Sequence, residues 1–370
     1  MLTFTSEFLD SLRGGFVGLG VGDALGVPVE TMSHEAILAA TGGKGVEDYI
    51  EPKQTRVKDT ERLSPGSTSD DTQLALVTSR SLCRSRGFSL HDQGLALVEE
   101  YEASTFGWGG TTTEAAVAIK AWRDSGGKEG RHPEIPAPPA RKDGMSAGSG
   151  PAMKVFPLAA FDLLGPGADD MKFLSDAMAL GMMTHGDLRA SIASVALGHA
   201  IAAFARTPRS AQERSFRRAV EAHVMAVVDR TEKMYVFARP QYPPFSDYLV
   251  RAFALMDDPV ALRTEVNASF LAVHSVPFAI ATALRHPGDF RAGVLEGVNA
   301  GRDTDTVGSM VGAMIGSRVG LGGIPAEWVA GLRDKDKIMA EADLLAMVMH
   351  GHDPLDDKRV LAPWLRDKSH

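Results

Sequence analysis

The stretch DTDTVGSMVGAMIGSRVG, residues 303–320, joins an acidic start to a run of residues with helical periodicity. Its apolar side chains recur at helical spacing and predict a helix over 304–320: Val307, Met310, Val311, Met314 and Ile315. Glycines at 308, 312, 316 and 320 form a stripe without side chains on one face. Each glycine costs a helix interior about 1 kcal/mol, so the stripe needs a compensation. Close packing against another helix would supply it.

A second glycine pair supports the same interpretation. Residues 6–24 present a broad apolar face, and Gly18 and Gly22 lie four residues apart on one side of the helix predicted there. Strand signals are scarce along the chain. We therefore predict an all-α protein, with helices at 6–24, 72–85, 170–206, 211–237, 244–256, 266–285, 304–320 and 335–349. The stretch 170–206 reads as two helices with a break near Thr184-His185-Gly186.

Three polar or Gly/Pro-bearing stretches interrupt the helices, at about 41–67, 124–150 and 239–244. Apolar helices continue on both sides of each one, which favours surface loops over linkers between domains. We predict one compact domain over residues 1–370, in which 1–13 form a short N-terminal extension.

Composition narrows the class of protein. The chain has 370 residues, of which 44% are hydrophobic and 23% charged, and one cysteine, Cys83. One cysteine forms no internal disulfide and fits a reducing cytoplasm. The net charge of −8 argues against a general nucleic-acid or membrane partner. No window holds the roughly 18 to 20 consecutive apolar residues that a membrane span needs, and the N-terminus does not read as a signal peptide.

Two acidic clusters are the candidate metal-binding residues. Ser69-Asp70-Asp71-Thr72 and Asp303-Thr304-Asp305-Thr306 each place two carboxylates beside hydroxyls at the start of a predicted helix. Such residues are also preferred N-caps, so capping alone is the alternative for each cluster taken singly. Four carboxylates among hydroxyls suit hard ions such as Mg²⁺, Mn²⁺ or Ca²⁺. The pair of clusters favours a two-metal hydrolase site.

Five motifs in order resemble the ADP-ribosylglycohydrolase family, which includes dinitrogen-reductase-activating glycohydrolases and ADP-ribosyl-acceptor hydrolases. They are GLGVGDALGVPVE at 18–30, SDDT at 69–72, GSGPAM at 148–153, Thr184-His185, and GRDTDT at 301–306. Three positions depart from the family pattern. Ser69 replaces a threonine, Arg302 replaces a glycine, and Gly107 stands where several arginine-directed members carry an aspartate.

The resemblance implies an all-helical fold with two Mg²⁺ or Mn²⁺ ions in a cleft. It implies six metal ligands: Ser69, Asp70, Asp71, Asp303, Asp305 and Thr306. The implied reaction is hydrolysis of the bond between ADP-ribose and a protein side chain, arginine in many members. A carboxylate must take a proton from the attacking water, and Glu30 and Asp305 are the two catalytic candidates. We expect Asp23 to be a buried hydrogen-bonding residue.

Other residues of the motifs are candidates for binding substrate. Gly-rich loops present backbone amides to phosphates, so we assign Gly148, Ser149 and Gly150 to the diphosphate and adjoining ribose. Met153 closes the same motif. His185 could contact the ribose or be a structural histidine, and Trp108 could stack on adenine or ribose or pack the core.

The resemblance implies a mono-ADP-ribosylated protein as partner and a monomeric state. A second hypothesis is an immunity protein that binds and blocks a cognate ADP-ribosyltransferase, with residues 1–13, 41–67 and 124–150 as contact surface. A structural relative without catalysis has no need of four gathered carboxylates. A generic two-metal phosphatase fits the ligands but not the Gly-rich motifs.

Overall fold

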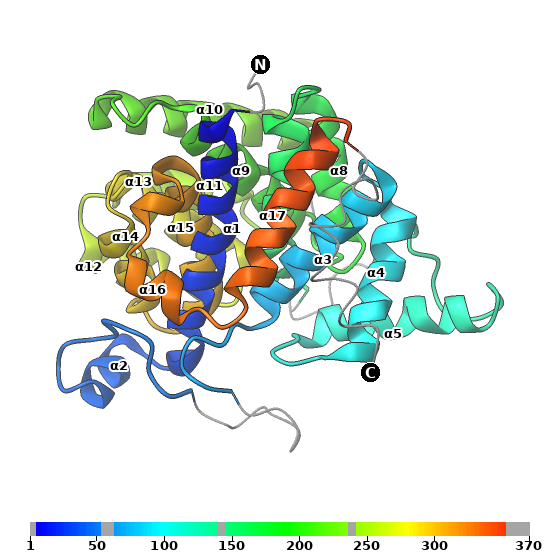
Figure 1. The fold of residues 1–370 in the computed structure, drawn as a ribbon, viewed down its shortest axis with the longest axis horizontal. Helices are drawn as coiled ribbons and strands as arrows, with labels where there is room; N and C mark the ends of the chain where they lie inside the picture. Colours follow the sequence, from blue (N-terminus) through cyan, green and yellow to red (C-terminus); the bar gives the residue numbers. More distant parts are fainter. Residues whose placement is uncertain (1–4, 53–62, 139–145, 236–241, 353–370) are drawn as a thin grey trace.

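The computed structural model describes residues 5–52, 63–138, 146–235 and 242–352. Within these ranges the regular structure is helical, and the only β-type pairing is two isolated bridges (Figure 1). The all-α prediction is therefore confirmed.

The first half of the chain begins with the long helix α1 and continues with shorter elements. They are α1 (Ser6–Gly26), η1 (Val27–Val29), α2 (His34–Ala40), α3 (Asp70–Ser85), α4 (Leu90–Ala103), α5 (Gly110–Asp124), α6 (Gly150–Met153), α7 (Phe156–Ala159) and the π-helix η2 (Ala160–Leu164).

The second half holds the remaining long helices. They are α8 (Asp170–Met182), α9 (Leu188–Arg206), α10 (Glu213–Met234), α11 (Phe245–Ala254), α12 (Pro259–Ala261), the π-helix η3 (Leu262–Val266), α13 (Ala272–Arg285), α14 (Phe290–Val298), α15 (Thr304–Val319), η4 (Leu321–Gly323), α16 (Ala326–Gly331) and α17 (Lys335–Met349).

Every helix predicted from periodicity is present. The predicted break at 184–186 separates α8 from α9, and α13 begins later than expected because Asn267 takes a positive φ of 57°. The described parts of 41–67 and 124–150 carry no helix between the elements that flank them, whereas 53–62, 139–145 and 236–241 lie outside the described residues. We expected residues 1–13 to form a short N-terminal extension. In the structure residues 6–13 are instead the first turns of α1, because Phe8 and Leu12 are buried in the core.

Helices α1 and α15 pack against each other through their glycines. A methyl group at Gly14, Gly18 or Gly22 would overlap the carbonyl oxygen of Gly316, Gly312 or Gly308, and the reverse substitutions meet the same partners. The two helices therefore run antiparallel with their backbones in contact over three turns, and this contact compensates the helical cost of glycine. We call this contact between α1 and α15 the glycine seam. Gly320 ends α15 with a positive φ of 70°, and its backbone meets Gly14 at the end of the seam.

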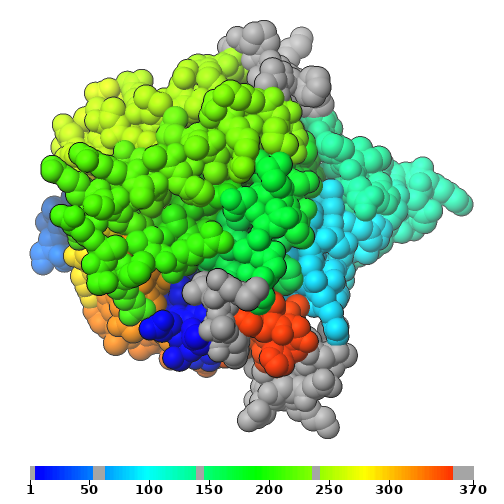
Figure 2. All heavy atoms as spheres, turned by 90° about the horizontal axis from the view of Figure 1, so that it is seen from above, coloured from blue at the N-terminus to red at the C-terminus, as the bar shows by residue number. Residues whose placement is uncertain are grey.

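The glycine seam lies in the centre of the molecule. All residues of α15 are buried, and α9, α13 and α14 pack around it. Among the described residues α9 is the one helix long and apolar enough to cross a membrane, yet 78% of it is buried inside this fold. The segment around α5 projects from the body on the side opposite α14 (Figures 1 and 2).

The seam fixes the position of two chain segments that carry acidic residues. The C-terminal end of α1 lies beside the N-terminal end of α15, because Gly26 contacts the backbone of Thr304 and Asp305. Helix α3 begins at the same place, so three helix ends meet.

Candidate active site

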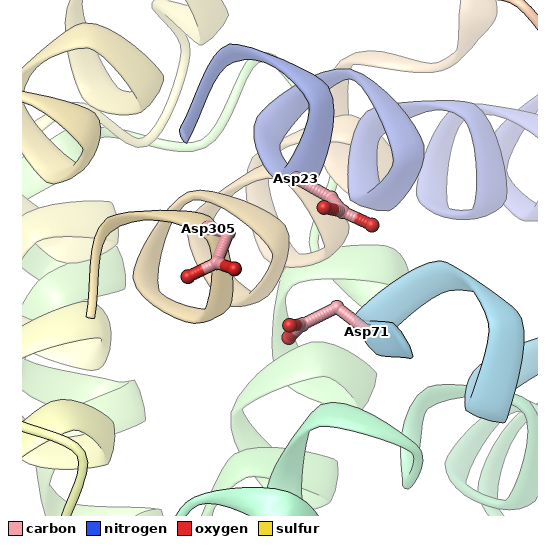
Figure 3. Close-up of side chains that lie close together, drawn as sticks. All are labelled: Asp23, Asp71 and Asp305. Carbon is pink, nitrogen blue, oxygen red and sulfur yellow. The ribbon is translucent and has the colours of Figure 1, made fainter. Parts of the chain in front are cut away.

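The three helix ends direct carboxylates toward one another. Asp23 of α1, Asp71 of α3 and Asp305 of α15 each offer a carboxylate oxygen, and these oxygens lie within 4.8 Å of one another (Figure 3). All three side chains are buried. The arrangement brings the two acidic sequence clusters into one site, with Asp23 as a third contributor.

Asp23 holds the start of α3. Its carboxylate accepts hydrogen bonds from the backbone N–H groups of Ser69 at 3.0 Å and Thr72 at 3.1 Å, and from the Thr72 hydroxyl at 2.6 Å. These bonds satisfy amide groups that a helix N-terminus leaves unpaired. Asp23 is the buried hydrogen-bonding residue that we expected. Burial raises its pKa to about 6, although the hydrogen bonds oppose the rise.

Asp71 links α3 to α15. One of its carboxylate oxygens accepts a bond from the Ser309 hydroxyl at 2.9 Å, and the other accepts from Thr306 Oγ1 at 3.2 Å and Ser69 Oγ at 3.3 Å. Two of the predicted ligands with hydroxyl groups, Ser69 and Thr306, thus lie on one carboxylate. Ser309 also touches it, which the sequence motifs did not indicate.

The alternative that an acidic cluster serves to cap its helix is supported for the cluster at 69–72 and not for the one at 303–306. Ser69 caps α3, because its hydroxyl accepts a bond from the N–H of Asp71 at 3.3 Å. Asp303 occupies the N-cap position of α15, but its side chain makes no capping bond in the described chain. Its carboxylate instead accepts a hydrogen bond from Ser149 Oγ at 2.9 Å. The acid at position 303 is therefore directed into the site.

The electrostatics of the cluster favour a bound cation. Burial raises the pKa of Asp70 to about 8 and of Asp303 to about 7, and neighbouring carboxylates add to the rise at both. Burial followed by neighbouring acids also raises the pKa of Asp71 and Asp305 well above the ordinary value. In the described part of the chain, no lysine or arginine forms an ion pair with these four aspartates. Buried like charges without a counter-ion are costly, and divalent cations would offset that cost.

Glu30 lies at the edge of the same cluster. It follows the short helix η1, is half-buried, and raises the pKa of Asp70, Asp303 and Asp305 by its charge. The structure thus brings both catalytic candidates, Glu30 and Asp305, to one place.

The loop before α6 contacts both the acidic cluster and His185. Gly148 forms a β-bridge with Leu271, and the N–H of Ser149 donates to the Phe270 carbonyl at 3.1 Å. The Ser149 amide is therefore occupied within the protein and is not available to a phosphate. A Cβ at Gly150 would lie 2.7 Å from His185 Cε1, so the glycine allows the imidazole ring to approach the loop.

The other predicted substrate residues have structural partners. Met153 is buried in the core, 6% exposed. Trp108 is half-buried, and its indole N–H donates to Gln73 Oε1 at 2.7 Å while its ring lies 6.0 Å from that of Tyr101. Contacts of Trp108 and Met153 with substrate remain predictions.

The backbone explains one departure from the family pattern, Gly107, and leaves another, Arg302, without an explanation. Gly107 has a φ of 80°, and a Cβ there would lie 2.5 Å from Asp70 Oδ1, so an aspartate at this position would strain the backbone and displace the Asp70 carboxylate. Arg302 has a φ of 70° and is exposed, and its N–H and carbonyl are bonded to Met32 and Thr31. A glycine would adopt that conformation without strain, so nothing in the structure explains the arginine.

Comparisons with known proteins agree with this geometry. The ADP-ribosylglycohydrolase family profile matches residues 5–354. The ADP-ribosyl-(dinitrogen reductase) glycohydrolase of Rhodospirillum rubrum is 25% identical over 327 residues, which cover 87% of this chain and 90% of that protein. A solved structure described as an ADP-ribosylglycohydrolase-related protein complex is similar with a TM-score of 0.63 and 26% identity, over 93% of this chain and 100% of that chain. Since the family profile spans almost all of the sequence that forms this fold and its acidic centre, the chain belongs to the ADP-ribosylglycohydrolase family.

Proposed function

We propose that this protein is a Mg²⁺-dependent hydrolase that removes ADP-ribose from modified arginine side chains of a protein, and so reverses mono-ADP-ribosylation. The observation that supports this is the burial of four aspartates from two distant helix starts in one site, with Glu30 at its edge. The R. rubrum relative is named for removing ADP-ribose from a protein, dinitrogen reductase.

The donor set fits hard divalent cations. Carboxylate and hydroxyl oxygens gather at the site, and its buried carboxylates with raised pKa values lack a counter-ion among the described residues. We assign two ions to this set: Ser69, Asp70, Asp71, Asp303, Asp305 and Thr306. Bound there, the ions would supply positive charge that orients the ribose hydroxyls and lowers the pKa of water.

Glu30 is the better placed of the two candidate bases. Asp305 is buried, 5% exposed, and as a metal ligand its oxygens would be occupied. Glu30 is half-buried at the edge of the cluster and can exchange a proton with solvent. We therefore assign Glu30 as the base that takes a proton from the attacking water, and Asp305 as a ligand of the ions. A carboxylate in this position also stabilises the positive charge that develops on the ribose as the glycosidic bond breaks.

The test is release of ADP-ribose from an arginine-ADP-ribosylated protein, measured with Mg²⁺, with EDTA and with the variant Asp305→Ala. We expect release with Mg²⁺ only, and a loss of about 1,000-fold or more in the variant, equivalent to about 4 kcal/mol of transition-state stabilisation. Glu47→Ala is the matched control, because Glu47 is an exposed acid outside the cluster.

Calorimetry with Mg²⁺ on the same samples separates binding from chemistry. Full activity in EDTA would contradict the metal dependence. Absence of release from arginine-, serine- and nucleic-acid-linked ADP-ribose alike would contradict the hydrolase itself.

A further inference from the structure

Lys154 is a fully buried lysine directly after α6. Its side chain is 1% exposed, and burial lowers its pKa to about 7. It makes one hydrogen bond in the described structure, from Nζ to Thr184 Oγ1 at 3.0 Å, and pairs with no carboxylate there. Burying a lysine for a single neutral partner is costly, so the residue calls for a role beyond packing.

The hydroxyl of Thr184 joins Lys154 to His185. It lies 2.9 Å from His185 Nδ1 and 3.4 Å from the Gly181 carbonyl oxygen. In its charged form Lys154 only donates hydrogen bonds, so the Thr184 hydroxyl then accepts from it. The single proton of the hydroxyl points either to Nδ1 or to the Gly181 carbonyl, and the shorter distance favours Nδ1. A neutral imidazole that accepts at Nδ1 carries its proton on Nε2.

His185 is suited to this neutral state. The side chain is 4% exposed, and burial, followed by the charge of Lys154, lowers its pKa to about 3. Nε2 makes no hydrogen bond to another described residue. It faces the loop before α6, since a Cβ at Gly148 or Gly150 would lie 3.3 or 3.2 Å from it. Because both positions are glycines, neither places a side chain over the Nε2 edge of the ring.

We propose that Lys154 is a positioning residue that acts through Thr184 to hold His185 as the Nε2–H tautomer, a hydrogen-bond donor to a ribose hydroxyl or phosphate oxygen of ADP-ribose. This proposal rests on the proposed function, because it takes ADP-ribose as the ligand of the site. The proposal also explains why a lysine is tolerated in the core. Its charge sets the direction of the hydrogen bonds that run from Lys154 through Thr184 to His185.

The test combines histidine nuclear magnetic resonance with binding of free ADP-ribose. Nitrogen-15 spectra of the whole protein distinguish the two imidazole tautomers, and His185→Asn identifies the His185 signals among the 11 histidines. We expect the Nε2–H tautomer in the unmodified protein below about pH 7, where Lys154 carries its charge. Thr184→Val keeps the shape of the side chain but removes the hydroxyl that links Lys154 to His185. It should give a mixture of His185 tautomers and an affinity for ADP-ribose about tenfold lower. Thr184→Ser should restore both.

The outcomes separate this proposal from its alternatives. An Nδ1–H tautomer in the unmodified protein would overturn it without any variant, as would an unchanged tautomer in Thr184→Val. A role of Lys154 in packing alone predicts that Lys154→Met alters stability but not the tautomer. None of these measurements requires hydrolysis, so they remain informative if the protein proves inactive on arginine-linked ADP-ribose. Affinity for Mg²⁺, which should not change in Thr184→Val, is the internal control.

Discussion

Helices α15 and α3 both begin with paired aspartates at the acidic site, but the fold holds them there in different ways. Helix α15 is fixed by backbone contact with α1 along the glycine seam, where Gly14, Gly18 and Gly22 meet the carbonyls of α15. The start of helix α3 is held by buried polar side chains: Asp23 accepts hydrogen bonds from its first turn, and Asp71 accepts them from α15. Position thus depends on steric fit for one acidic cluster and on polar contacts for the other.

This difference predicts how the start of α15 and the start of α3 should each respond to substitutions. A backbone seam tolerates no added atom, because neither helix can yield without moving its whole length. A carboxylate anchor can be weakened by degrees, since each hydrogen bond contributes about 1 kcal/mol and unpaired donors cost more. Substitutions in the two regions should therefore differ in size and in character.

The largest effect is expected from Gly22→Ala. The added methyl would overlap the carbonyl of Gly308, so the two central helices must separate. We expect a loss of about 4 kcal/mol or more in the free energy of unfolding, or no folded protein. Urea unfolding followed by circular dichroism measures it.

The matched control for the seam is Gly20→Ala on the same helix. A methyl there meets the ends of two side chains, Ile338 at 2.9 Å and Leu332 at 3.4 Å, and both can move. The gain in helix propensity, up to about 1 kcal/mol, should offset the crowding. Equal losses in the two variants would show that the seam is not specific.

The packing of these helices illustrates what the sequence could predict. Glycines four residues apart on two predicted helices indicated close packing, and the acidic clusters at helix starts indicated a shared site. The pairing of Gly22 with Gly308 and the hydrogen bonds of Asp23 could not be predicted, because they depend on the register between helices far apart in sequence.

Some helices were also missed for physical reasons. Helix α5 starts at Gly110 with Thr111, Thr112 and Thr113, which are poor helix formers, so tertiary contacts rather than propensity decide its conformation. Helix α4 contains Gly94, which weakens its pattern, although its Ser89 N-cap was a usable signal. Lys154 carried no signal at all, since its significance lies in burial beside Thr184.

An intermediate effect is expected when the anchor of α3 is removed. Asp23→Ala leaves the N–H groups of Ser69 and Thr72 without their buried acceptor, which should cost about 2 to 4 kcal/mol in the free energy of unfolding. Because the start of α3 also carries proposed metal ligands, the affinity for Mg²⁺ should fall about 10- to 100-fold, as for residues that orient ligands. Urea unfolding and calorimetry measure the two effects.

Asp23→Asn separates hydrogen bonding from charge. It removes the same charge as the alanine variant but keeps an acceptor oxygen for the first turn of α3. The loss of stability should therefore be smaller than in Asp23→Ala. Identical behaviour of the two variants would assign the anchor to charge and contradict the hydrogen-bond account.

A gradual effect, spread over several pH units, is expected from the acidic site without metal. Burial raises the pKa of Asp23 to about 6, of Asp303 to about 7 and of Asp70 to about 8, against about 3.9 in an unfolded chain. Between about pH 4 and pH 8 the folded protein therefore retains protons that the unfolded chain has released. The stability from these groups is complete below about pH 4 and is lost as pH rises through the folded pKa values. Each group contributes a slope of at most about 1.4 kcal/mol per pH unit.

Urea unfolding in EDTA at several values from pH 5 to pH 8 should show this decline, and Asp303→Asn, which retains an acceptor for Ser149, should make it shallower. Mg²⁺ should reduce the decline further, because a bound cation favours the charged carboxylates that α3 and α15 bring together. A stability in EDTA that rises over this range would mean that the carboxylates do not share a buried site, and the comparison between the two helices would lose its basis.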